Sequence, residues 1–194
     1  MIRKILFIHG LASSGAFKTA VSLHRLFRPC EVIAPDVPIE PDKALDCLAA
    51  ICEAEKPDLI VGLSLGGFLA QKLRGYCKVL VNPDLHPSRL LRTKLGEMKY
   101  LSPRKDGADS FFVTEEICEG YSLLEERQFK GLDEHEISLT KGLFADKDEI
   151  VDCAGEFEKH YPDRSAIYPG NHLPTHLQLK AYLVPLVESW NDYL

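Results

Sequence analysis

The chain lacks the long apolar run that would place it in a membrane or send it out of the cell. Its 194 residues contain no stretch near the ~20 apolar residues that a membrane-spanning helix needs. The apolar run closest to the N-terminus covers only residues 5–8 and ends at His9, which is too short for a signal peptide. These absences predict a cytoplasmic protein with no membrane span.

The chain also lacks paired cysteines and an excess of basic charge. Lysine and arginine number 23 against 29 acidic residues, so the formal net charge of −6 disfavours nucleic acid as a partner. No Cys-x-x-Cys pair occurs among the six cysteines, so we expect free thiols and no structural zinc. The oligomeric state stays open at this point.

Short apolar runs alternate along the chain with segments of helical periodicity. This alternation is typical of βαβ units and predicts a parallel sheet. We therefore expect one α/β domain over residues 1–194, with about six parallel strands flanked by helices. The expected strands are 4–8, 31–34, 58–63, 77–81, 141–145 and 164–168, and the expected helices are 15–27, 42–55, 65–74, 151–160 and 174–193, the last kinked at Pro185.

Residues 84–140 interrupt this alternation, and their length predicts a helical lid or cap insertion. Helices are expected at 88–97 and 114–127. The basic run from Arg89 to Lys105 is either a solvated face or a contact for an anionic leaving group. The apolar residues of the insertion form either a satellite core or a wall for an acyl chain: Leu101, Phe111, Phe112, Val113, Ile117, Tyr121, Leu123 and Leu124.

Residues 62–66 read Gly-Leu-Ser-Leu-Gly and lie directly between an apolar run and a helical one. This strand–turn–helix context is the one in which Gly-x-Ser-x-Gly presents a nucleophilic serine. Ser64 is then the nucleophile, and the N–H of Leu65 is aimed at the developing oxyanion. The alternative is a glycine-rich turn with a capping serine.

A serine nucleophile needs a base and an orienting acid, which follow it in that fold as Asp and then His. After the fifth strand we favour Asp148 over Asp146, which is expected to bond the turn backbone. After the sixth strand we favour His172 over His176. Gly10 at the end of the first strand lets the N–H of Leu11 point at the same oxyanion, and His9 is expected to be structural.

These segments resemble the α/β-hydrolase superfamily, and more narrowly the small bacterial YqiA-like esterases. The resemblance rests on residues 7–14, 62–68, 81–83, 148–152 and 170–172, whereas residues 98–140 show no family pattern. It implies a serine esterase that acts on a small-molecule ester or thioester without metal or cofactor. By position it makes Ser64 the nucleophile, Asp148 the acid and His172 the base.

The predicted function is therefore hydrolysis of carboxylic esters or thioesters through a Ser-His-Asp triad and an acyl-enzyme intermediate. Two alternatives stay open. One is acyl transfer or another hydrolytic reaction on the same triad. The other is an inactive binding module, because a fold by itself does not prove chemistry.

Overall fold

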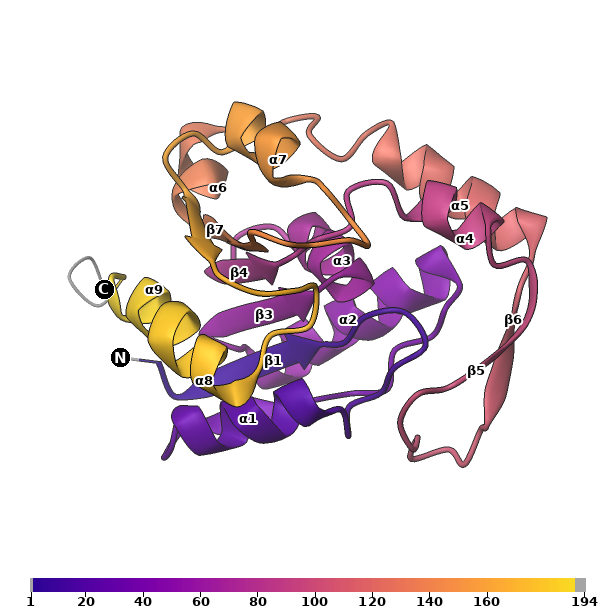
Figure 1. Ribbon diagram of the computed structural model, residues 1–194, viewed down its shortest axis with the longest axis horizontal. Coiled ribbons are helices and arrows are strands. Elements are labelled where there is room, and N and C mark those ends of the chain that lie inside the picture. The colour runs from indigo at the N-terminus through magenta and orange to yellow at the C-terminus, as the bar shows by residue number, and fades with distance from the viewer. Residues whose placement is uncertain (1, 191–194) are drawn as a thin grey trace.

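A six-stranded parallel sheet forms the centre of the computed structural model, which describes residues 2–190 (Figure 1). The strand order is β2-β1-β3-β4-β7-β8, and every neighbouring pair is parallel. This confirms the expected α/β class. The strands are β1 (Lys4–Ile8), β2 (Glu31–Ile33), β3 (Leu59–Leu63), β4 (Lys78–Val81), β7 (Thr140–Ala145) and β8 (Ser165–Tyr168).

The inner strands β1, β3 and β4 are nearly continuous apolar runs because both faces of the sheet are covered there, whereas the edge strands β2 and β8 are partly exposed. In β1, Ile5 and Phe7 pack into one core, while Leu6 and Ile8 pack into the other. This alternation follows from the two-residue period of a strand. A parallel sheet buried on both faces favours apolar residues at successive positions rather than an apolar–polar alternation.

Helices divide between the two faces of the sheet. The core on one face takes its residues from α2 (Pro41–Glu55), α3 (Leu65–Lys72) and α7 (Ala154–His160). The core on the other face takes them from α1 (Lys18–Leu26) and from the C-terminal helical run. None of the helices within residues 2–190 is long and apolar enough to cross a bilayer.

The C-terminal helical run changes its hydrogen-bond pattern just before Pro185. It consists of α8 (His176–Gln178), the π-helical turn η1 (Leu179–Leu183) and α9 (Val184–Glu188). Proline has no N–H and its ring crowds the carbonyl four residues earlier, so the chain widens there to a π turn. The expected kink therefore takes this form. The expected helical residues 191–193 lie outside the described residues.

The insertion of residues 84–140 contains a β-hairpin as well as helices. Residues 96 and 97, which we expected to end a helix over 88–97, instead belong to a strand that covers residues 96–99. The helix ends at Arg92, and Gly96, whose φ of +107° is a conformation that favours glycine, starts the hairpin. The expected helix over 114–127 is α5. The elements are α4 (Pro87–Arg92), antiparallel β5 (Gly96–Lys99) and β6 (Ser110–Val113), α5 (Glu115–Glu125) and α6 (Glu134–Ser138).

A buried ion pair joins the insertion to the first residue of β4. Lys78 of β4 is fully buried, and its ammonium donates to Glu136 of α6. The other carboxylate oxygen of Glu136 accepts the N–H of Gly75 at 2.9 Å. Burial lowers the pKa of Lys78, although Glu136 opposes that shift. Each charge therefore depends on its partner, because water does not reach the ammonium.

Removing one partner of this pair should be costly. We expect Lys78→Met to lower the free energy of unfolding by about 3–5 kcal/mol, because it leaves an uncompensated carboxylate in the interior. The double variant with Glu136→Gln should recover most of that loss. Urea unfolding at pH 7 measures both, and a loss below about 1 kcal/mol for the single variant would contradict this account.

Candidate active site

Ser64 stands on a sharp turn between β3 and α3. Its φ of +56° and ψ of −121° are unusual for a residue with a side chain. At the neighbouring positions 62 and 66 there is no room for any side chain. A Cβ at Gly62 would lie 2.4 Å from the carbonyl oxygen of Gly66, and a Cβ at Gly66 would lie 2.2 Å from that of Ile8. The turn therefore requires both glycines of the motif.

Two backbone N–H groups lie next to this serine. The N–H of Leu65 is at the first position of α3, so it has no acceptor within the helix. Among the described residues, no acceptor is found for the N–H of Leu11 either. The loop that carries Leu11 abuts the serine, because a Cβ at Gly10 would lie 3.2 Å from the Cβ of Ser64.

His172 and Asp148 form a hydrogen-bonded pair at the ends of β8 and β7. The Nδ1 of His172 lies 2.7 Å from Oδ2 of Asp148, and both side chains are 8% exposed. A carboxylate accepts only, so Nδ1 carries the proton and Nε2 of the neutral ring is left as a base. The pair is thus arranged as a base held by an acid.

The second oxygen of Asp148 is also occupied. Its Oδ1 accepts the N–H groups of Ile150 at 2.9 Å and Val151 at 3.0 Å. Burial disfavours the charge, but the hydrogen bonds from His172 and from these two N–H groups outweigh it and hold the pKa of Asp148 below its usual range. Asp148 is therefore a carboxylate at neutral pH.

The two competing residues lie elsewhere. Asp146 is exposed, and its Oδ1 accepts the N–H of Gly170 at 2.8 Å, which is the turn role expected from the sequence. His176 is exposed at the start of α8. His9 uses both ring nitrogens: Nδ1 donates to the carbonyl of Gly10 at 2.9 Å, and Nε2 accepts the N–H of Val37 at 3.0 Å. Burial lowers the pKa of His9, so the ring is neutral and structural.

Asn82 ties the loops of Asp148 and His172 together, a role that the sequence did not predict. Its Oδ1 accepts the N–H of Ala145 at 2.7 Å, just before the loop of the acid. Its Nδ2 donates to the carbonyl of His172 at 2.6 Å and to the hydroxyl of Tyr168 at 2.8 Å. The signal was a polar residue directly between a buried strand and Pro83, which the sequence analysis used only as part of a resemblance.

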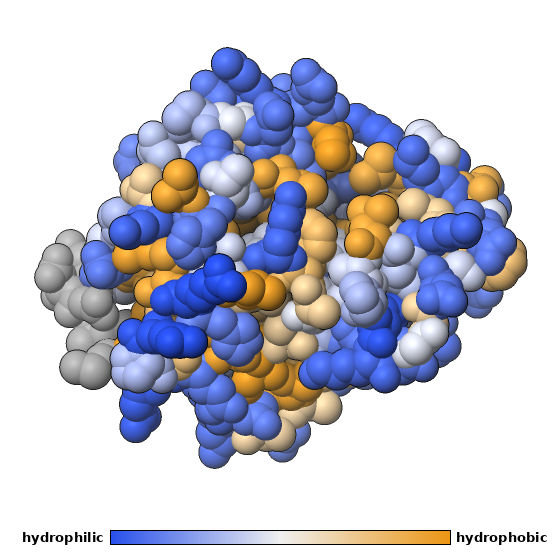
Figure 2. Space-filling model, turned by 60° about the horizontal axis from the view of Figure 1, so that its bottom comes forward, coloured by the Kyte–Doolittle hydropathy of each residue, from blue (hydrophilic) through white to orange (hydrophobic). Residues whose placement is uncertain are grey.

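Ser64 and His172 line one cavity of about 460 Å³, a volume within the range of small-molecule sites. The insertion supplies part of the wall through Leu90, Met98 and Leu101. The rim is open to solvent and carries exposed apolar residues, Leu101, Ile150 and Leu173 being 73%, 55% and 38% exposed, together with the exposed charged residues Lys94 and Glu149. Figure 2 shows apolar side chains gathered across the middle of one face, with charged ones around them.

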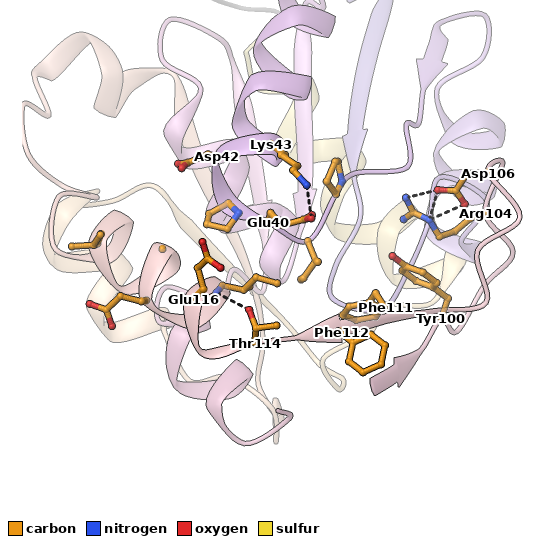
Figure 3. Close-up of a pocket in the computed structure, with 17 residues that line it drawn as sticks. Glu40, Asp42, Lys43, Tyr100, Arg104, Asp106, Phe111, Phe112, Thr114 and Glu116 are labelled. Atoms are coloured by element: carbon orange, nitrogen blue, oxygen red, sulfur yellow. Dashed lines mark hydrogen bonds and ion pairs between the residues drawn. The ribbon is translucent and has the colours of Figure 1, made fainter. Parts of the chain in front are cut away.

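The larger cavity of about 1060 Å³ lies elsewhere, between the start of α2 and the β6–α5 segment (Figure 3). It contains none of Ser64, Asp148 and His172, and two of its acids pair with cations of the same groove, Glu40 with Lys43 and Asp106 with Arg104. We call it the second groove.

The apolar residues of the insertion divide between core and surface. Val113, Ile117 and Tyr121 are buried in the core on the α2 and α3 face. Phe111 also belongs to that core, and both Phe111 and Phe112 line the second groove. Neither phenylalanine lines the cavity of Ser64, although Phe111 borders a small space beside Leu11 and Leu65.

The chain was compared with known families. A family model described as "Uncharacterised protein family (UPF0227)" matches residues 4–176. The chain belongs to this family. No curated protein sequence matches it. The family match covers most of the chain, and the fold of this UPF0227 member is the α/β-hydrolase fold that the resemblance implied.

Solved structures with the same fold extend over almost the whole UPF0227 chain. Est1E from Butyrivibrio proteoclasticus has a TM-score of 0.65 at 17% identity, with 96% of this chain and 89% of that chain covered. A pyrethroid hydrolase from Sphingobium faniae JZ-2 has a TM-score of 0.59 at 16% identity, with 99% and 98% covered. A tomato methylketone synthase I variant has a TM-score of 0.64 at 12% identity, with 98% of each chain covered. At these identities the likeness shows the fold.

Substitution of the two aspartates after β7, Asp146 and Asp148, should affect kcat differently. We expect Asp148→Asn to lower kcat by up to ~10⁴-fold, because an amide favours the wrong tautomer of His172. Asp146→Asn, the matched control, keeps an acceptor oxygen for its turn bond, so it should leave kcat nearly unchanged and cost at most about 1 kcal/mol of stability. Ester-hydrolysis rates and unfolding curves of both variants test this, and the opposite order in kcat would move the acid to Asp146.

Proposed function

We propose that this chain is a serine hydrolase that cleaves carboxylic esters or thioesters. The observation that carries the proposal is the cavity lined by both Ser64, on its strained turn, and His172, whose ring is held by Asp148. The same fold in esterases, lipolytic enzymes and a thioesterase domain supports the reaction class.

Acylation begins with Oγ of Ser64 attacking the carbonyl carbon of the substrate. The Nε2 of His172 takes the hydroxyl proton, and Asp148 stabilises the cation that forms. The N–H groups of Leu11 and Leu65 bind the oxyanion of the tetrahedral intermediate, each donor being typically worth about 3–4 kcal/mol. The imidazolium then returns its proton to the leaving alcohol or thiol, and the acyl group remains on Ser64.

Deacylation repeats these steps with water. His172 takes a proton from a water molecule, which attacks the acyl carbonyl and forms a second oxyanion. The bond to Oγ breaks as His172 protonates Ser64. The products are a carboxylic acid and the restored enzyme, so no cofactor enters the balance.

The nucleophile is tested by Ser64→Ala. We expect ester hydrolysis to fall by about 10⁴-fold or more, since only oxyanion and binding effects remain without the nucleophile. Labelling by a fluorophosphonate should disappear with it. Ser122→Ala in α5 is the matched control and should keep both properties. A Ser64→Ala variant with a tenth of the normal rate would contradict the proposal.

The acyl wall is tested by Leu101→Ala against Phe112→Ala. Both side chains are exposed and belong to the hairpin region, but only Leu101 lines the cavity of Ser64. We expect Leu101→Ala to lower kcat/KM for hexanoate esters about fivefold more than for acetate esters, since each buried methylene contributes about 0.8 kcal/mol. Phe112→Ala should leave this ratio unchanged. Equal effects of Leu101→Ala on both esters would place the acyl group elsewhere.

A further inference from the structure

The loop that carries Leu11 is held between two other segments of the chain. On one side lie residues 34–37, which follow β2, and on the other lie residues 101–105, which follow β5. A Cβ at Gly15 would lie 2.1 Å from the carbonyl oxygen of Ala34, so the loop is pressed against the first segment. The second segment belongs to the insertion. We call residues 101–105 the hairpin strap.

A single carboxylate joins all three segments. Oδ1 of Asp36 accepts the N–H of Gly15 in the loop at 2.8 Å. Oδ2 of Asp36 accepts the N–H of Lys105 in the hairpin strap at 2.6 Å. Hydrogen bonds to a charged acceptor are stronger than neutral ones. Asp36 therefore fixes the loop and the strap relative to each other.

Further hydrogen bonds join the loop of Leu11 directly to the hairpin strap. The N–H of Leu101 donates to the carbonyl of Ala12 at 2.7 Å, and Ala12 has a φ of +56° that a residue with a side chain rarely adopts. The hydroxyl of Ser14 lies 2.8 Å from that of Ser102 and donates to the carbonyl of Pro103 at 2.7 Å. The strap thus holds the loop in an unfavourable backbone conformation.

Arg104 fixes the strap in place, and Figure 3 shows its guanidinium paired with Asp106 near the ring of Tyr100. The guanidinium of Arg104 lies 4.5 Å from the ring centroid of Tyr100 and pairs with Asp106. Its Nη1 also donates to the carbonyl of Val37 at 3.4 Å, next to Asp36. These contacts hold the strap in a fixed position, so that it can in turn position the loop of Leu11.

The peptide that presents the N–H of Leu11 lies at the start of this loop. Its carbonyl belongs to Gly10 and accepts from His9, which fixes one side of the peptide. The other side continues into residues 12–15, where the strap and Asp36 make the bonds described above. An oxyanion donor must lie within about 2.7–3.1 Å of the oxyanion, so small shifts of this loop matter.

We propose that Asp36 is a positioning residue for catalysis: it clamps the Leu11 loop to the hairpin strap and so keeps the N–H of Leu11 aimed at the oxyanion. This inference rests on the proposed function. It gives the insertion a part in turnover as well as in substrate choice, because one side of the clamp belongs to the insertion.

The test compares Asp36→Ala and Asp36→Asn with Asp109→Asn, which removes a charge from an exposed hairpin residue that makes no side-chain bond within the described residues. Asp36 is half-buried, so water can reach the freed N–H groups and the variants should fold. We expect kcat to fall about 10- to 100-fold in Asp36→Ala, since a shift of about 1 Å in a reacting group costs up to ~10²-fold. KM should change little. Asp36→Asn keeps one acceptor oxygen, so its kcat should lie between those of Asp36→Ala and Asp109→Asn.

A purely structural role is separated by two readouts. Rates are referred to active sites titrated with a fluorophosphonate, so unfolded protein does not count. The inhibition constant of an alkyl boronic acid, whose adduct with a serine places an oxygen in the oxyanion position, should rise in proportion to the loss of kcat. If Asp36→Ala matches Asp109→Asn in titrated kcat, or loses kcat without weaker boronate inhibition, the inference is wrong.

The two proposals fail differently. If the wild-type protein neither hydrolyses esters nor reacts with the fluorophosphonate, the proposed function is wrong. If the wild type does both and the Asp36 variants keep normal kcat, only the role of Asp36 is wrong.

Discussion

The close contact between Gly66 and the carbonyl of Ile8 is the constraint from which the site follows. With no side chain at Gly66, α3 starts directly against the end of β1, and the turn before it must be sharp. That turn places Ser64 beside Gly10, so the proposed nucleophile and the loop of Leu11 are neighbours although 54 positions separate Ser64 from Gly10 in the sequence. A larger residue at position 66 would separate the first strand from the helix of the nucleophile.

The same edge of the sheet collects Asp148 and His172, the other two residues of the proposed triad. Parallel strands end at one edge, so the loops after β7 and β8 approach the turn of Ser64 whatever lies between them in the sequence. Adjacent loops still need a fixed distance, and Asn82 supplies it by bonding both. A buried amide suits this task because it donates and accepts at once, whereas a carboxylate there would repel Asp148.

The sequence allowed the sheet to be predicted closely because its inner strands are buried on both faces and read as short apolar runs. The roles of Asp146 and His9 followed from their places at strand ends, and the structure bears both out. The hairpin β5–β6 did not follow. Its strands are four residues long, and their half-buried pattern depends on docking against distant residues. Asp36 was missed for the same reason, since its two partners lie 21 and 69 positions away.

The insertion leaves the sheet after β4 and returns at β7, and these strands are direct neighbours. A change in its length therefore leaves the sheet register intact, which makes this point of the fold tolerant of new segments. The hairpin is less independent, because Ala12 and Ser14 of the Leu11 loop, and Asp36 and Val37 of the loop after β2, hydrogen-bond to the strap that follows β5. The insertion and these two loops therefore have to change together if their packing is to be kept. Across the family, substrate range should then vary together with the sequences of these two loops.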